Sequence, residues 1–131
     1  MSRAEILACC CRSDDLAVIR RAVGAKGPAL KVLDSPMELT RQVVTRRPAA
    51  VVLGIGSRTR ERADVIRTID AIRKELPVII IADDDSLQLE RHVRQAPIFY
   101  YLVHPVQKRE VEALLKDAVR LSKASPRRKK P

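Results

Sequence analysis

Residues 76–82 read LPVIIIA, a leucine and a proline followed by a run of apolar residues with no polar residue between them. An uninterrupted apolar run of this length is typical of a strand that is covered on both faces in a parallel sheet. Pro77 stands directly before the run, so any preceding helix must already have ended there. The stretch therefore predicts a buried strand over Val78–Ala82.

Working outward, four more runs that are continuously apolar, or nearly so, punctuate the chain, at Ile6–Cys10, Ala29–Leu33, Ala50–Ile55 and Ile98–Val103. The segments between and after them have helical periodicity. The clearest stripe is the last, at spacing i, i+3, i+4, i+7 and i+8, formed by Val111, Leu114, Leu115, Ala118 and Val119. Five strands alternating with five helices predict an α/β fold, in which a five-stranded parallel sheet is doubly wound with helices on both faces.

Helix-capping residues agree with this division. We expect Ser13 or Asp14 to cap the first helix, and Asp34 or Ser35 to cap the second, with Pro36 in its first turn.

The functional crevice of such a sheet lies outside the carboxyl ends of its strands. The residues at these ends are Cys10 and Cys11 after the first strand, Gly54 in the third, Ala82 in the fourth and His104 after the fifth. These are the positions at which any site is expected.

The charge of the chain is divided between a body and a tail. Among 131 residues, 26 Lys and Arg outnumber 16 Asp and Glu, which gives a net charge of +10. The last eight residues, 124–131, hold four cations and no acid: Arg127, Arg128, Lys129 and Lys130. We predict that this segment is a disordered basic tail, either merely solvated or attracted to phosphate backbones or anionic surfaces. A protein that binds single-stranded nucleic acid would need aromatic residues interleaved with its basic clusters, and this sequence has none there.

Several classes of protein are excluded or disfavoured. No apolar run approaches the about 18 residues that would span a membrane. The three contiguous cysteines, Cys9 to Cys11, cannot form a disulfide framework, and no signal-peptide pattern opens the sequence, so a cytoplasmic protein is expected. The GlyIleGly at residues 54–56 lacks the third glycine of a dinucleotide fingerprint, and no triad pattern suggests a hydrolase. We expect no enzyme activity.

Over roughly residues 4–123 the chain resembles the receiver domain of bacterial two-component response regulators, a CheY-like, flavodoxin-like (βα)5 three-layer sandwich. The resemblance is carried by ILACCC, RRPAAVVLG, LPVIIIA, and YLVHP followed by a long terminal helix. Pro105, and an aromatic residue at Tyr101, match the family pattern at the fifth strand. The resemblance implies one receiver-like domain over residues 1–123, followed by the tail 124–131.

The residues that carry the family's chemistry are missing from this sequence. Receivers hold Mg²⁺ with an acidic pair where this chain has Cys10 and Cys11, and they accept phosphate on an Asp where it has Gly54. A hydroxyl is replaced by Ala82 and a lysine by His104. The resemblance therefore implies a pseudo-receiver that neither binds Mg²⁺ at these positions nor becomes phosphorylated by the usual route, with no metal or cofactor. We interpret the acidic run Asp83–Asp85 as helix N-terminal charge.

Two functional interpretations of these replacements, a metal site and a redox site, stay open. If Cys10, Cys11 and His104 converge, they offer ligands suited to zinc, and Cys10 with Cys11 offers a vicinal disulfide. The favoured interpretation is that the cysteines are small apolar residues that fill the core.

Because neither phosphorylation nor catalysis is expected, the function is expected to depend on a surface that binds a partner. The resemblance implies a partner or homodimer face on the fourth helix, fifth strand and fifth helix, carrying Arg91, Arg94, Tyr101, Lys108 and Arg109. The alternative is that Tyr101 packs under the fourth helix and the cations are only solvated. Two hypotheses follow: a stand-alone signalling module that docks to a protein partner, or a nucleic-acid- or anionic-surface-associated adaptor that uses the basic body and tail.

Overall fold

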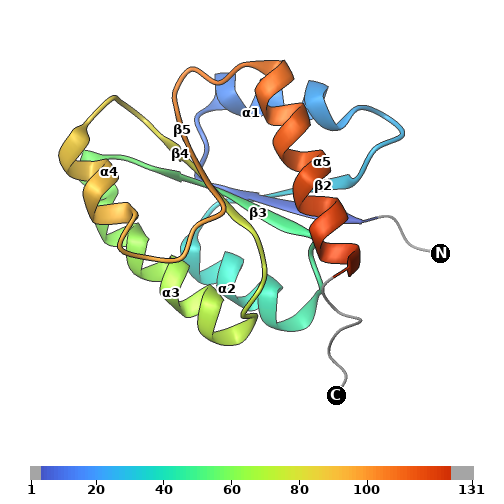
Figure 1. The fold of residues 1–131 in the computed structure, drawn as a ribbon, viewed down its shortest axis with the longest axis horizontal. Coiled ribbons are helices and arrows are strands. Elements are labelled where there is room, and N and C mark those ends of the chain that lie inside the picture. Colours follow the sequence, from blue (N-terminus) through green and yellow to red (C-terminus); the bar gives the residue numbers. More distant parts are fainter. Residues whose placement is uncertain (1–3, 125–131) are drawn as a thin grey trace.

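A parallel sheet of five strands divides the molecule into layers (Figure 1). The computed structural model describes residues 4–124, with side chains over residues 4–122. The strands are β1 (Glu5–Cys9), β2 (Ala29–Leu33), β3 (Ala50–Ile55), β4 (Val78–Ala82) and β5 (Tyr100–Val103), in the spatial order β2-β1-β3-β4-β5. Every pair of neighbouring strands is parallel, as predicted.

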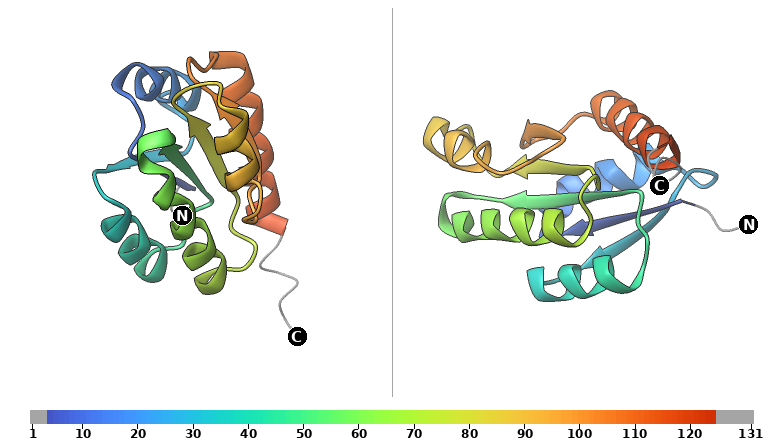
Figure 2. Two further views of the ribbon diagram at one scale, coloured as in Figure 1. Left: turned by 90° about the vertical axis from the view of Figure 1, so that its left-hand side faces the viewer. Right: turned by 60° about the horizontal axis from the view of Figure 1, so that its bottom comes forward.

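Helices cover both faces of the sheet (Figure 2). They are α1 (Ser13–Val23), α2 (Pro36–Thr45), α3 (Ala63–Ile72), α4 (Leu87–Val93) and α5 (Lys108–Ala124). The helices α1 and α5 pack on one face, and α2, α3 and α4 pack on the other, so that the sheet separates two apolar clusters. This is the predicted doubly wound (βα)5 sandwich.

The continuous apolar runs correspond to burial in the middle of the sheet. Every residue of β3 and of β4 is buried. The edge strand β2 is different, because only its last residue is buried and Val32 is 38% exposed. Covering on both faces is therefore complete only for the inner strands.

The two predicted helix caps have different outcomes. Ser35 caps α2, since its hydroxyl accepts a hydrogen bond from the Glu38 N–H at 3.2 Å. The prediction for α1 is wrong: the N-cap residue is Arg12, which makes no side-chain cap bond, and Ser13 and Asp14 lie inside the first turn.

The acidic run Asp83–Asp85 lies in the loop before α4 rather than in its first turn. The N-cap residue of that helix is Ser86, whose hydroxyl accepts from the Leu89 N–H at 3.1 Å. The run therefore precedes the helix, and the helix dipole acts on it less strongly than the sequence interpretation assumed.

A short 3-10 helix, η1 (Ser57–Arg62), follows β3 and was not predicted. The Gly56 N–H donates to Thr59 Oγ1 at 2.8 Å, and the Thr59 N–H donates to the Gly56 carbonyl at 3.0 Å. Three strand ends also differ from prediction: β1 begins at Glu5 and ends at Cys9, and β5 begins at Tyr100.

At the C-terminus, α5 extends to Ala124, the first residue of the segment predicted to be disordered. The cations Arg127, Arg128, Lys129 and Lys130 lie outside the described residues, so their role stays a prediction. Within residues 4–124, no helix combines the length and apolar character needed to cross a bilayer.

Candidate functional site

The positions singled out in the sequence gather at the edge of the sheet where the parallel strands end. Gly54 lies near the end of β3, and Ala82 is the last residue of β4. His104 directly follows β5, and its N–H donates to the Ala82 carbonyl at 2.8 Å. Cys10 and Cys11 begin the connection from β1 to α1.

Gly54 has no room for a side chain. A Cβ placed on it would lie 2.2 Å from the carbonyl oxygen of Cys10, 2.8 Å from the carbonyl carbon of that residue and 3.0 Å from the Cα of Cys11. Cys10 itself has a φ of 63°, in the left-handed region, which a cysteine rarely adopts. The β1–α1 connection therefore occupies the space into which a phosphate-accepting side chain at this position would extend.

The carbonyl of Gly54 is also engaged. Arg62, at the end of η1, donates from Nη1 to this oxygen at 3.2 Å. The element that the sequence did not predict thus holds an arginine against the end of β3.

The cysteines do not form a site with His104. Within the described part of the chain, the single group of potential metal ligands within 4.8 Å of one another is Asp14, Asp15 and His104, and it contains no sulfur. Cys11 instead directs its sulfur toward the Val52 carbonyl, 3.9 Å away. The Cys10 sulfur lies 3.9 Å from the Asp34 carbonyl, so the zinc site that the sequence left open for Cys10, Cys11 and His104 does not form among the described residues.

The thiols behave as part of the core. Cys9 is fully buried, and Cys10 and Cys11 are half-buried beside the two apolar clusters. Burial raises the pKa of the Cys11 thiol to about 12 and also raises the pKa of Cys9. The closest sulfur contact, 3.3 Å, joins Cys9 to Cys10 rather than Cys10 to Cys11. These observations favour the core-filling interpretation.

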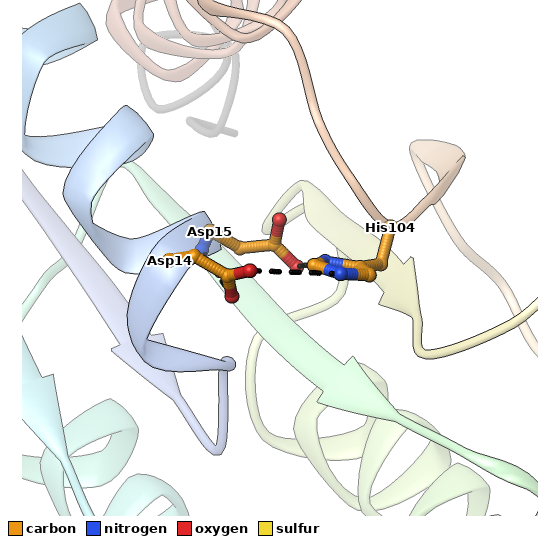
Figure 3. A group of neighbouring side chains, drawn as sticks. All are labelled: Asp14, Asp15 and His104. Atoms are coloured by element: carbon orange, nitrogen blue, oxygen red, sulfur yellow. Dashed lines mark hydrogen bonds and ion pairs between the residues drawn. The ribbon is translucent and has the colours of Figure 1, made fainter.

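An unforeseen histidine–carboxylate pair lies at the same edge of the sheet (Figure 3). His104 Nδ1 lies 2.8 Å from Oδ2 of Asp15, a carboxylate that is only 1% exposed. The second oxygen of Asp15 accepts the N–H of Val106 at 3.2 Å. A buried carboxylate is costly unless it is paired and hydrogen-bonded, and both conditions are met here. The pair ties the start of α1 to the connection that leads into α5.

Asp14 completes the group from the solvent side. Its Oδ2 lies 3.6 Å from Nε2 of His104, and its side chain is 64% exposed. Its Oδ1 accepts the N–H of Asp15 at 3.1 Å and lies 3.6 Å from Nε of Arg12. Both carboxylates sit in the first turn of α1, where negative charge is favoured by the helix dipole.

Sequence reasoning missed Asp15, although its spacing held the necessary information. Asp15 precedes Ile19, on the buried stripe of the first helix, by four residues, so the two side chains share one face. A carboxylate on a buried face needs a cationic or hydrogen-bonding partner. His104, which directly follows β5, is that partner.

On the predicted partner face, the alternative interpretation of Tyr101 is confirmed. Tyr101 is 9% exposed, and the guanidinium carbon of Arg94 lies 5.4 Å from the centroid of its ring. Arg94 also pairs with Glu90, Nε to Oε2, at 2.7 Å. The Tyr101 hydroxyl has no hydrogen-bond partner among residues 4–122, and burial raises its pKa to about 12.

The surface of this face is formed by other side chains. Arg91, Lys108 and Arg109 are exposed, as predicted. Tyr100, at the start of β5, is 45% exposed and is the accessible aromatic residue here, although the sequence analysis singled out its neighbour.

Comparison with known proteins supports the fold. No protein-family model matches the sequence, and no curated protein is a significant match. Among solved structures, the chain is similar to the signal receiver domain of an HD domain-containing protein from Pseudomonas fluorescens Pf-5, with a TM-score of 0.82 and 16% identity over 98% of this chain and 95% of that one. It is also similar to a CheY-like response regulator receiver domain protein from Methanospirillum hungatei JF-1 (TM-score 0.76, 15% identity, 94% and 98% covered). A CheY-like protein, tadZ, from Pseudomonas aeruginosa PAO1 gives a TM-score of 0.76 at 14% identity over 88% and 99%. The chain thus has the fold of CheY-like receiver domains.

Proposed function

We propose that this chain is a bacterial, cytoplasmic signalling module of receiver fold that acts by docking to a protein partner, without phosphorylation on the usual aspartate. The observation that carries the proposal is the packing of Gly54 against the backbone of Cys10. A receiver needs a carboxylate at this position to accept the phosphoryl group, and here both the carboxylate and the space for it are absent.

The Mg²⁺ on which receivers depend does not fit the residues at the corresponding positions. Cys10 and Cys11 stand where the family has its acidic pair, and Gly54 contributes no oxygen from a side chain. Mg²⁺ requires hard oxygen ligands in near-octahedral geometry, whereas thiols are soft ligands. We therefore derive no phosphoryl-transfer step for this chain and propose no enzyme activity.

The proposed docking face consists of α4, β5 and the start of α5. Within the described residues, Arg91 and Arg109 form no ion pair, so both guanidinium groups are available to a partner. Tyr100, at the start of β5, supplies exposed aromatic area on the same face. Tyr and Arg are the residue types that most often dominate binding energy at interfaces. The positive charge favours a partner with an acidic surface, or a second copy that contributes acidic groups.

Sedimentation of the full chain, with and without candidate partners, tests the docking face. Arg91→Glu together with Arg109→Glu should abolish any association through it. A matched double reversal on the other side of the sheet, at the exposed cations of the last turn of α1, Arg20→Glu with Arg21→Glu, should leave it intact. Association that survives the first pair of changes and is lost with the second would place the interface elsewhere.

The rival function, attachment to nucleic acid or another anionic surface, depends on the tail. It predicts binding to heterogeneous DNA that persists at moderate salt and is lost when residues 124–131 are removed. Binding of this kind would replace protein docking as the preferred function, while its absence would leave the tail as a solvated extension.

A further inference from the structure

The arrangement of His104 between two aspartates has a feature that the proposed function does not use. Asp15, as a carboxylate, can only accept hydrogen bonds, and its Oδ2 lies 2.8 Å from His104 Nδ1. The proton of a neutral imidazole therefore resides on Nδ1. Its second nitrogen, Nε2, then has a free lone pair, and this atom faces the carboxylate of Asp14, to which Figure 3 draws a dashed line.

Two lone-pair-bearing atoms 3.6 Å apart are complementary to a cation between them. We propose that His104 Nε2 and the Asp14 carboxylate bind a divalent transition-metal ion, of which Zn²⁺ is the representative, with Asp15 positioning the imidazole. The inference departs from the sequence-based expectation of no metal, and it is independent of the proposed docking face.

The distance between His104 Nε2 and Asp14 Oδ2 allows both atoms to coordinate one ion without movement of either side chain. With metal–ligand bonds of about 2.1 Å to nitrogen and oxygen, a separation of 3.6 Å gives an N–metal–O angle of about 118°, close to that of a tetrahedral site. The exposed side of Asp14 leaves the remaining positions to water or to a ligand from a partner. The site is thus of the open kind, and weaker than a closed structural zinc site.

The environment of His104 resembles the outer shell of known metal sites. A ligating histidine usually donates its other ring N–H to a carboxylate, which fixes the tautomer and orients the ring. Asp15 does this here, and it is itself held by the N–H of Val106 at 3.2 Å. Because one ligand is an imidazole, Zn²⁺, Co²⁺ or Ni²⁺ fits the donor set and Mg²⁺ does not.

Two groups compete with the metal. A proton on Nε2 would satisfy the same geometry, so the ion must displace it. Arg12 Nε lies 3.6 Å from Oδ1 of Asp14, whereas the proposed ion takes Oδ2, and the Arg12 side chain is half exposed.

The test is metal titration of the full chain without any histidine tag, using Zn²⁺ by calorimetry and Co²⁺ by visible absorption. We expect one ion per chain for the wild type, and loss of that binding in Asp14→Asn and in His104→Asn. Asp15→Asn should weaken binding by about 10–100-fold, as other outer-shell substitutions do. The matched controls are His92→Asn, which changes the other histidine, and Asp64→Asn, an exposed acid in the first turn of α3. Both should bind as the wild type does.

Several results would overturn the proposal. They are no binding by the wild type, equal binding by Asp14→Asn or His104→Asn, and loss of binding in the controls. Thiolate-to-cobalt charge-transfer absorption would assign the ion to the cysteines instead. Because Asp14 is exposed, Asp14→Asn should fold normally, as circular dichroism will verify, so the test does not depend on the more buried Asp15.

Discussion

The packing of Gly54 can be tested by adding a single methyl group. In Gly54→Ala the new Cβ would meet three backbone atoms of Cys10 and Cys11 at 2.2 to 3.0 Å, where ordinary contacts begin near 3.4 Å. Backbone atoms cannot rotate away, so the β1–α1 connection must move or the strand must shift. Relief of this clash is expected to disturb the half-buried cysteines that follow β1.

The expected cost follows from two opposing terms. Replacing glycine by alanine stabilises by about 0.4–1 kcal/mol through the unfolded chain. Forcing extra volume into a well-packed region costs about 1–3 kcal/mol, occasionally more, and a contact with backbone on one side of a buried strand belongs at the upper end. We therefore expect Gly54→Ala to lower the free energy of unfolding by about 2 kcal/mol.

Gly56→Ala is the matched control. Its Cβ would lie 2.6 Å from Oδ2 of Asp83, the end of an exposed side chain that can turn into solvent. Gly56 has extended backbone angles, so alanine fits its conformation. We expect a change within about 1 kcal/mol of the wild type.

Urea unfolding followed by circular dichroism measures both variants. With a slope of about 2 kcal/mol per molar urea, the Gly54→Ala midpoint should fall by about 1 M at unchanged slope, while that of Gly56→Ala should barely move. A Gly54→Ala protein as stable as the wild type would refute the claim that backbone fills this space. Gly54→Asp carries the same Cβ and should be at least as destabilised.

Further predictions concern the pair of Asp15 and His104, the buried tyrosine and alkaline stability. Asp15→Ala should lower the free energy of unfolding by about 3 kcal/mol, and a double-mutant cycle with His104→Ala should give a coupling energy well above zero, whereas additive effects would mean that the pair does not interact. Tyr101→Phe should stabilise by about 1 kcal/mol, because it removes a buried hydroxyl without a partner among the described residues, while Tyr100→Phe, at an exposed position, should have little effect. The Cys11 thiol keeps its proton up to a pKa of about 12 in the folded protein, but ionises near 9.0 once unfolded, so the unfolded state binds fewer protons between these values. Stability should therefore fall as the pH rises above 9, and Cys11→Ala should make the fall smaller in pH-dependent urea unfolding; an equal fall would contradict this assignment.

Much of the fold was predictable because a strand that is buried on both faces has a continuously apolar sequence. The strands β2, β3 and β4 have the predicted bounds, and in β3 and β4 both faces are covered and no residue is polar. The 3-10 helix η1 was not predicted because its sequence, SRTRER, has no apolar stripe. It is fixed instead by hydrogen bonds between Thr59 and Gly56, which no periodicity reports.

The site was less predictable because it depends on contacts between distant parts of the chain. Alignment to a family pattern located Gly54 and His104, but not the backbone of Cys10 that closes over the glycine. Likewise, the partner of His104 comes from the first turn of α1, 89 residues earlier. The role of Asp15 could have been predicted from its place on the buried face of α1. The burial of Tyr101 depends on how α4 packs over β5, which the sequence alone does not show.

Above all, we propose that this chain of receiver fold signals without accepting a phosphoryl group. Incubation of the full chain with acetyl phosphate and Mg²⁺, followed by intact-protein mass spectrometry, tests it most directly, with a phosphorylatable receiver treated in parallel. We predict that the control gains a phosphoryl group and that this chain does not. A stable acyl-phosphate adduct on any of its aspartates would contradict the claim.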